Sequence, residues 1–208
     1  ISRFFLPAET KYGTILLYFI SKIKDFMYNF KEPKDAYEIS RQFMKEGVSA
    51  GTVEFPPYVT FELLNACNFR CIMCPNSYMK RHKQEMDLNL FKKIIDEISQ
   101  YGSLIRFIGF DEPLLYGKIK DAIKYVKDKG LLLHITTNGS LLNEELIKTI
   151  IDNKVDSIIF SFQGLSKKEY CFMRNVSPKA YSKVIDNIKL LYKSKKNKKP
   201  FIKITTTT

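Results

Sequence analysis

The amino-acid sequence predicts an α/β protein in which helices cover a parallel sheet. From residue 58 onward, short apolar segments alternate with longer segments whose apolar residues recur at helical spacing. Glycine, proline and asparagine fall between these segments, where turns are needed. Strands that alternate with helices in this order form a parallel sheet with right-handed connections. The length of 208 residues suits one domain with a substantial core.

Residues 1–57 are expected to form an N-terminal helical cap, and residues 58–208 a core domain. Apolar residues at helical spacing predict a helix over 14–30, and a second helix is expected near 35–46. The uninterrupted apolar run at 15–20 is too short to span a bilayer, so no transmembrane segment is expected. The aromatic, lysine-edged face of the first helix is compatible with a membrane surface, although packing on the core domain is the commoner role of such a face.

The core domain is expected to contain five strands with four helices between them. Asp87 is the expected N-cap of the first helix, and Gly130 is the residue at which the second helix is expected to end. The expected strands are 58–63, 104–108, 131–136, 157–162 and 201–205. The apolar faces of the expected helices are Leu88, Phe91, Ile94, Ile95 and Ile98; Ile119, Ala122, Ile123 and Val126; Leu146, Ile147, Ile150 and Ile151; and Tyr181, Val184, Ile185, Ile188 and Leu191.

Three cysteines stand in one short loop, residues 67–74, which we call the cysteine loop. Cys67, Cys71 and Cys74 are separated by three and then two residues and follow the first expected strand. Thiolates are the usual protein ligands of iron–sulfur clusters. Three ligands leave one iron of a four-iron cluster without a protein donor, and an open iron can bind and activate a small molecule. The spacing therefore favours a catalytic cluster over one that only carries electrons.

Other uses of the cysteines fit the sequence less well. A structural zinc site normally needs four protein ligands, and no second pair of Cys or His residues stands near the loop. A disulfide framework needs an even number of cysteines in a small secreted domain, whereas the fourth cysteine, Cys171, lies far downstream. Cysteines that only fill space in a core are not expected at such close spacing in a loop. Cys171 itself is expected to be a buried thiol in a helical stretch.

Distinctive residues also follow the next three expected strands. These are residues 109–115 after the second strand, 137–139 after the third and 161–164 at the end of the fourth. Each segment alone is a weak signal, because glycine, proline and asparagine are ordinary turn residues. The carboxyl ends of parallel strands meet at one edge of a sheet, where such proteins bind their ligands. Together with the cysteine loop, the segments predict a ligand site at this edge.

Two further residues are expected to be structural. His134 lies inside the third expected strand, where a satisfied core or rim histidine is more common than a ligand. Arg81 follows the cysteine loop and could either neutralise the charge of a cluster or hold that loop, and support of the loop is the expected role.

The composition favours a cytoplasmic protein with a solvated basic surface. The chain has 34 basic and 22 acidic residues, a formal charge of +12, which is compatible with nucleic acid or an anionic membrane surface. The lysines are, however, spread over every expected helix, and the only dense run is at 193–199. No nucleic-acid partner is therefore expected. Few cysteines, most of them in one loop, fit a reducing cytoplasm.

The cysteine loop resembles the cluster loop of the radical S-adenosylmethionine (radical SAM) enzymes. The segment Cys-Asn-Phe-Arg-Cys-Ile-Met-Cys-Pro-Asn-Ser, followed by Met79, Arg81 and Met86, is most similar to the branch that carries a SPASM or twitch extension. The resemblance extends from about residue 58 to 208. It implies a partial (β/α)6 TIM-like radical SAM barrel, of which about five β/α units are present. The sixth unit and any SPASM-like extension, with any auxiliary iron–sulfur clusters, are expected in a C-terminal part outside this sequence.

The resemblance also implies roles for individual residues. Cys67, Cys71 and Cys74 would hold a 4Fe-4S cluster, and S-adenosylmethionine (SAM) would chelate the fourth iron. The residues expected around SAM are Glu112 at the amino group, Asn138 near the methionyl group, Ser161 as a polar contact, Arg174 at the carboxylate and Met73 beside the adenine.

Two segments depart from the family pattern. A Gly-Gly-Glu-Pro-like segment is usual after the second strand, and here Phe110 and Asp111 stand where glycines are expected before Glu112. Gln163 replaces the aspartate of the common Ser-x-Asp-Gly pattern that begins at Ser161.

The function implied by the resemblance is radical catalysis. One electron from the cluster would cleave SAM to a 5′-deoxyadenosyl radical, which would abstract hydrogen from an unactivated carbon of a peptide or small-molecule substrate. An electron donor such as flavodoxin or ferredoxin would be needed. The alternatives are a non-catalytic iron–sulfur or zinc-binding module and a basic nucleic-acid-binding protein, which would not cleave SAM.

Overall fold

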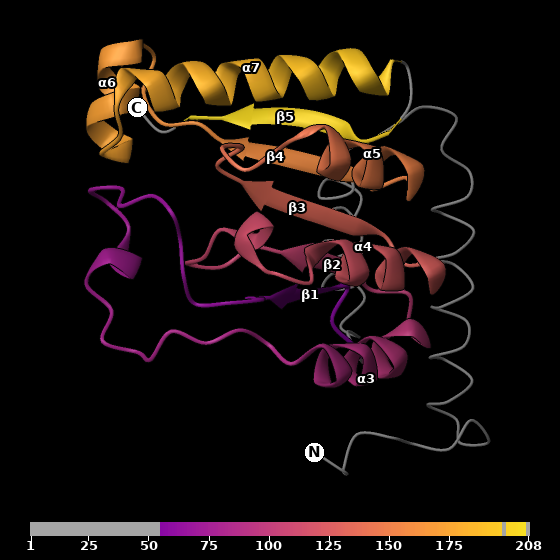
Figure 1. Ribbon diagram of the computed structural model, residues 1–208. Helices are drawn as coiled ribbons and strands as arrows, with labels where there is room; N and C mark the ends of the chain where they lie inside the picture. The colour runs from indigo at the N-terminus through magenta and orange to yellow at the C-terminus, as the bar shows by residue number, and fades with distance from the viewer. Residues whose placement is uncertain (1–54, 197–198, 207–208) are drawn as a thin grey trace, which may run out of the picture.

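The fold is a parallel sheet whose strands follow one another in space as they do in sequence. A computed structural model describes residues 55–196 and 199–206 (Figure 1). Its five strands pair in the order β1-β2-β3-β4-β5, and every pairing is parallel. The strands are β1 Tyr58–Phe61, β2 Leu104–Phe107, β3 Leu133–Thr137, β4 Ser157–Ser161 and β5 Phe201–Thr205. The alternating α/β fold predicted from the sequence is confirmed, and the helices predicted at 14–30 and 35–46 lie outside the described residues.

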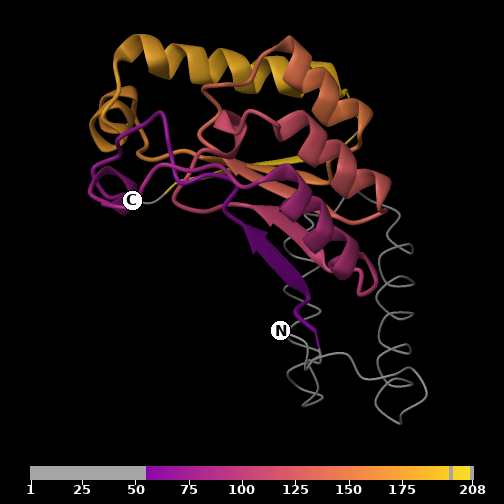
Figure 2. The ribbon, with the colours of Figure 1, turned by 60° about the horizontal axis from the view of Figure 1, so that its bottom comes forward.

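Helices connect the strands and form a layer on one side of the sheet. The helices are α3 Leu88–Ser99, α4 Ile119–Asp128, α5 Glu144–Asp152, α6 Lys167–Arg174 and α7 Pro178–Lys195, and the short 3₁₀ turns are η1 Pro75–Ser77 and η2 Pro113–Leu115. Neighbouring helices contact one another in the order α3, α4, α5 and α7 (Figures 1 and 2). Among the described residues, no helix is both long and apolar enough to cross a membrane.

The helix ends follow from capping residues. The carboxylate of Asp87 accepts hydrogen bonds from the backbone N–H groups of Asn89 and Leu90, both at 2.9 Å, which confirms the predicted N-cap of α3. Gly130, just after α4, has a φ of 72°, which glycine adopts without a steric penalty. Helix α6 begins with a capping box in which Ser166 and Glu169 satisfy each other's backbone N–H groups. The sequence pattern did not delimit α6, because the helix is short and carries few apolar residues.

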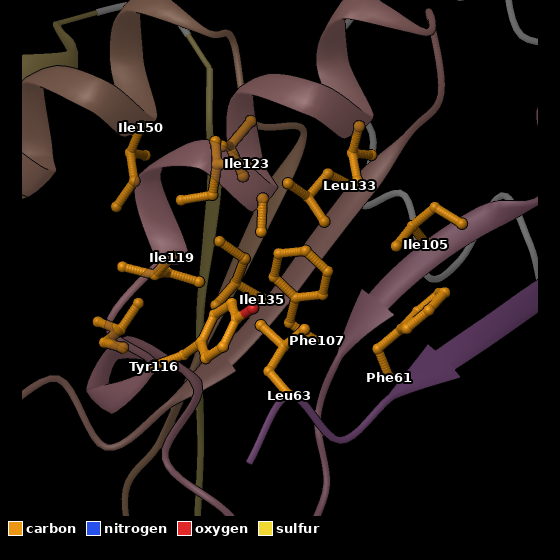
Figure 3. Close-up of a cluster of buried hydrophobic side chains, with 14 of the residues drawn as sticks. Phe61, Leu63, Ile105, Phe107, Tyr116, Ile119, Ile123, Leu133, Ile135 and Ile150 are labelled. Atoms are coloured by element: carbon orange, nitrogen blue, oxygen red, sulfur yellow. The ribbon is translucent and has the colours of Figure 1, made fainter. Parts of the chain in front are cut away.

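The two faces of the sheet carry different side chains. The face under the helices is apolar and forms the main core, part of which is drawn in Figure 3. Strand residues that contribute to it are Phe61, Ile105, Phe107, Leu133, Ile135, Ile158 and Phe160. Because side chains alternate along a strand, the other face carries His134, whose ring nitrogens lie 2.7 Å from Ser157 Oγ and 3.0 Å from Thr136 Oγ1. His134 is thus a satisfied buried histidine, as predicted.

Candidate functional site

A pocket lies at the carboxyl ends of the strands, and every residue predicted to bind a cofactor lines it. Its volume is about 230 Å³. Cys67, Cys71, Met73 and Cys74 come from the loop after β1, Glu112 from the segment after β2, Asn138 from the end of β3, Ser161 from the end of β4 and Arg174 from α6. The structure therefore brings together residues that are spread over more than a hundred positions of the sequence. Met73 is 45% exposed and lies at the rim of the pocket.

The three thiols of the cysteine loop are free, and burial raises the pKa of one of them, Cys67. None of the four described cysteines is in a disulfide, and Cys71 is buried. Burial raises the pKa of Cys67 to about 11, although the backbone N–H of Phe69, 3.4 Å from its sulfur, acts in the opposite direction. A metal that binds such a thiol must displace its proton. Among the described residues, no group of three or more His, Cys, Asp or Glu side chains is arranged to hold a single metal ion.

The cysteine loop follows β1 but packs against α6 and α7, the helices that follow β4. The loop follows β1, yet the backbone N–H of Ile72 donates to the carbonyl of Met173 at 3.0 Å, near the end of α6. Phe69, Cys71, Tyr170 and Val184 form a small apolar cluster, which we call the second core. In Figures 1 and 2 the loop extends from β1 across to α6. The position of the thiols therefore depends on α6 and α7 as well as on β1.

Arg174, at the end of α6, contacts Cys71 of the cysteine loop. Its Nη1 donates a hydrogen bond to Cys71 Sγ at 3.2 Å, and the side chain is only 7% exposed. The other two guanidinium nitrogens, Nε and Nη2, are buried and have no hydrogen-bond partner. A buried donor without a partner is costly, so these two nitrogens mark a place where an acceptor fits. Nε and Nη2 form one edge of the guanidinium, which matches the two oxygens of a carboxylate.

Asn138 contacts the cysteine loop from the β3 side. Its Nδ2 donates to Asn68 Oδ1 at 3.0 Å and lies 4.0 Å from Cys67 Sγ. Asn68 Nδ2 in turn donates to Ser140 Oγ at 2.8 Å. In this structure the side chain of Asn138 therefore positions the loop. Contact with a methionyl group, which the family resemblance implies, stays a prediction.

Glu112 is buried, and its carboxylate is already hydrogen-bonded by the protein. Oε1 accepts from the hydroxyl of Thr137 at 2.6 Å and the backbone N–H of Leu114 at 3.2 Å, while Oε2 accepts from the backbone N–H of Asn138 at 2.7 Å. Burial raises the pKa of Glu112, and these hydrogen bonds and the charge of Arg174 oppose that shift. Glu112 thus joins the segments after β2 and β3, a positioning role that sequence reasoning missed because its partners lie 25 and 26 positions away.

Asp111, which replaces a glycine of the family pattern, is half-buried, and both oxygens of its carboxylate are shielded from water. Burial raises its pKa to about 7, and the negative charges of Glu112 and Glu62 add to the shift. The segment still needs one glycine: a Cβ on Gly109 would lie 2.8 Å from Glu62 Cγ and 3.0 Å from Asp111 Oδ1. The close approach of β1 and β2 is thus preserved at Gly109, two residues earlier than Asp111.

Two other expectations can be compared with the structure. The guanidinium of Arg81 donates to both carboxylate oxygens of Glu62, at 2.9 and 3.1 Å, and Glu62 Oε1 also accepts from the backbone N–H of Phe110 at 3.2 Å. Arg81 therefore ties the segment after the cysteine loop to the ends of β1 and β2, in agreement with its expected supporting role. Cys171, expected to be buried, is instead half-buried in α6.

The chain is similar to known radical SAM proteins. The model of the Radical SAM superfamily matches residues 61–207. The tungsten-containing aldehyde ferredoxin oxidoreductase cofactor-modifying protein of Pyrococcus furiosus is 36% identical over 110 residues, which are 52% of this chain and 31% of that protein. The PqqA peptide cyclase of Bradyrhizobium diazoefficiens is 26% identical over 124 residues, 59% of this chain and 33% of that protein.

A solved structure extends the similarity to the fold. Streptococcus suis SuiB bound to S-adenosylmethionine superposes with a TM-score of 0.60 at 17% identity, covering 94% of this chain and 47% of SuiB. At this identity the comparison supports the fold alone. The chain spans about a third of the length of the two curated relatives and about half of SuiB.

Proposed function

The chain belongs to the radical SAM superfamily, and we propose that it carries the cluster and SAM site of a radical enzyme. Members of this superfamily use a 4Fe-4S cluster together with SAM. We assign Cys67, Cys71 and Cys74 as the cluster ligands and the pocket beside them as the SAM site. When bound, the cluster supplies one electron to SAM, which yields a 5′-deoxyadenosyl radical that abstracts hydrogen from an unactivated carbon. The observation that carries the proposal is that the three thiols and the predicted SAM contacts line the same pocket.

The donor set of the pocket fits both cofactors. Three free thiols in one short loop match the ligands of a cluster with one open iron. The partnerless edge of Arg174 matches a carboxylate, which SAM carries. Ser161 and Asn138 add hydrogen-bonding groups to the pocket wall, and Met73 adds an apolar surface for a purine at the rim. The protein's contribution is then to bind, orient and shield SAM from water.

The substrate we propose is a peptide or a small molecule. The relatives include a peptide cyclase and a protein that modifies a cofactor. The reaction also needs a one-electron donor, for which flavodoxin or ferredoxin is suited. A reducing cytoplasm fits the free thiols. Nucleic acid is not proposed as a partner, because the basic residues are spread over the surface helices.

The proposal is tested by anaerobic reconstitution followed by incubation with SAM and a strong reductant. The expected result is a four-iron absorbance and the formation of 5′-deoxyadenosine and methionine. Protein that holds the cluster but leaves SAM intact would be a non-catalytic iron–sulfur module. Protein that takes up zinc but no iron would contradict the cluster assignment.

A further inference from the structure

We propose that Arg174 raises the reduction potential of the cluster by donating a hydrogen bond to Cys71 while its opposite edge holds a carboxylate. This inference rests on the proposed function, because it needs the cluster to be bound by Cys71. It assigns Arg174 a role towards the cluster in addition to the role towards SAM that the family resemblance implies.

The geometry around Arg174 separates the two edges of its guanidinium. Nη1 lies 3.2 Å from Cys71 Sγ, and both side chains are buried, at 7% and 6% exposure. Nε and Nη2, the pair on the other edge, have no hydrogen-bond partner, and Arg174 lines the pocket. One guanidinium can therefore contact the cysteine sulfur and a ligand carboxylate at the same time. An exposed arginine on a rotatable side chain would not be held in both contacts.

Helix α6 fixes the arginine in this position. Arg174 is the last residue of α6, and the preceding residue, Met173, accepts a backbone hydrogen bond from Ile72 in the cysteine loop at 3.0 Å. Tyr170, one turn earlier in the helix, is fully buried in the second core with Cys71. The helix and the loop are thus joined by a backbone bond, a side-chain bond and an apolar contact. The distance between the guanidinium and the sulfur is set by packing on both sides.

A positive charge at this distance favours the reduced cluster. Reduction adds one negative charge to the cluster, and hydrogen bonds to its sulfurs together with nearby net charge set its potential. An arginine stays protonated in proteins, and its effect is larger in a buried site than in water. Glu112, a buried acid that lines the same pocket and feels the charge of Arg174, accepts hydrogen bonds from the hydroxyl of Thr137 and two backbone N–H groups. Its carboxylate therefore does not neutralise Arg174 by a direct ion pair.

The test is a potentiometric titration of the reconstituted protein without SAM, monitored by electron paramagnetic resonance of the reduced cluster. Arg174→Gln removes the charge, and Arg174→Lys keeps a charge but loses the planar fork. Lys168→Gln is the matched control, because Lys168 is an exposed base in the same helix. We expect Arg174→Gln to lower the equilibrium constant for one-electron reduction about tenfold, which corresponds to a decrease of about 59 mV in the reduction potential. Lys168→Gln should leave the potential unchanged, and Arg174→Lys should stay close to the wild-type value while SAM binding weakens.

The outcomes separate this inference from the proposed function. If wild-type protein holds no cluster, the proposed function fails. If wild-type and Arg174→Gln proteins hold clusters of equal potential, only the role of Arg174 is overturned. If both Arg174 variants lose the cluster while Lys168→Gln keeps it, Arg174 is a support of the loop and the inference is also overturned. If the reduction potential of Lys168→Gln falls by the same amount, the effect comes from overall charge, and this result would contradict the inference.

Discussion

The two apolar cores in the described part of the chain are assembled in different ways. The main core lies between the sheet and its helices, and its residues repeat at regular intervals within each strand and helix. The second core lies beneath the cysteine loop and joins Phe69 and Cys71 to Tyr170 and Val184. The first core is encoded by local periodicity, whereas the second depends on contacts between distant segments. We infer that the site can be disturbed without the fold, whereas damage to the main core disturbs both.

The largest effect is expected in the main core. Phe107 is fully buried and its ring meets the rings of Phe61 and Phe91 edge-on, at centroid distances of 6.5 and 5.9 Å. Phe107→Ala should lower the free energy of unfolding by about 3–5 kcal/mol and should remove the cluster as well. Urea denaturation and iron content measure the two effects. Phe172→Ala, at a 69% exposed position, is the control and should change stability by less than about 0.5 kcal/mol.

The cysteines should affect the site without the fold. Replacing Cys67, Cys71 or Cys74 by Ala should abolish the four-iron absorbance and SAM cleavage, because each removes one cluster ligand. The circular dichroism of the cluster-free protein should be unchanged. Cys171→Ala should keep both the cluster and the cleavage, since Cys171 does not line the pocket. A variant of Cys171 that loses the cluster, with one of the three loop cysteines dispensable, would show that the loop assignment is wrong.

A smaller effect is expected from the half-buried acid beside the pocket, and it depends on pH. The pKa of Asp111 is raised to about 7 in the folded protein, mainly by burial. The folded state therefore binds this proton more tightly than the unfolded state, so stability should fall as pH rises from about 4 to 7. Between pH 5 and pH 8 the free energy of unfolding of the cluster-free protein should fall by about 2–3 kcal/mol through this group. Asp111→Asn should flatten the dependence in urea denaturation, and equal slopes in both proteins would refute the role of Asp111.

The smallest effect is expected at the exposed contact that supports the cysteine loop. The Arg81–Glu62 pair is bidentate but partly exposed, with side-chain exposures of 48% and 28%. Arg81→Gln should lower the free energy of unfolding only slightly, and less at high salt, because the pair is exposed to solvent. The cluster should be retained. A complete loss of cluster in this variant would mean that the ends of β1 and β2 control the loop more than the second core does.

The sequence predicted the strands, most of the helices and the residues that line the pocket. Apolar residues at strand and helix spacing located every strand and the helices α3, α4, α5 and α7, and cysteine spacing located the loop. The boundaries moved by a few residues; the third strand, for example, begins at Leu133 and not at residue 131. The order of the strands placed the cysteine loop and the segments that contain Glu112, Asn138 and Ser161 on one edge, because parallel strands end together. Arg174, which lies in a helix, was assigned from the family resemblance.

What the sequence did not predict is which partner each site residue contacts. The carboxylate of Glu112 is bound by Thr137 and Asn138, and Arg174 by Cys71, and none of these pairs is local. These long-range contacts depend on three-dimensional packing, and no spacing rule encodes them. Helix α6 was not delimited because it is short and carries few apolar residues, although the Ser-x-x-Glu spacing of its capping box, Ser166 and Glu169, is a signal that could have located its start.

The hydrogen bond between Arg174 and Cys71 joins residues 103 positions apart, and this separation has a consequence for biosynthesis. Chains are made from the N-terminus at about 5–20 residues per second, so the thiols precede α6 by roughly 5–20 s. Arrested nascent chains that end before residue 167 should leave Cys71 open to alkylation, and chains in which α7 has also emerged should protect it. Until the helix arrives, the cysteines of each new chain are exposed to oxidants and stray metal ions, so iron is best delivered after α6 has docked.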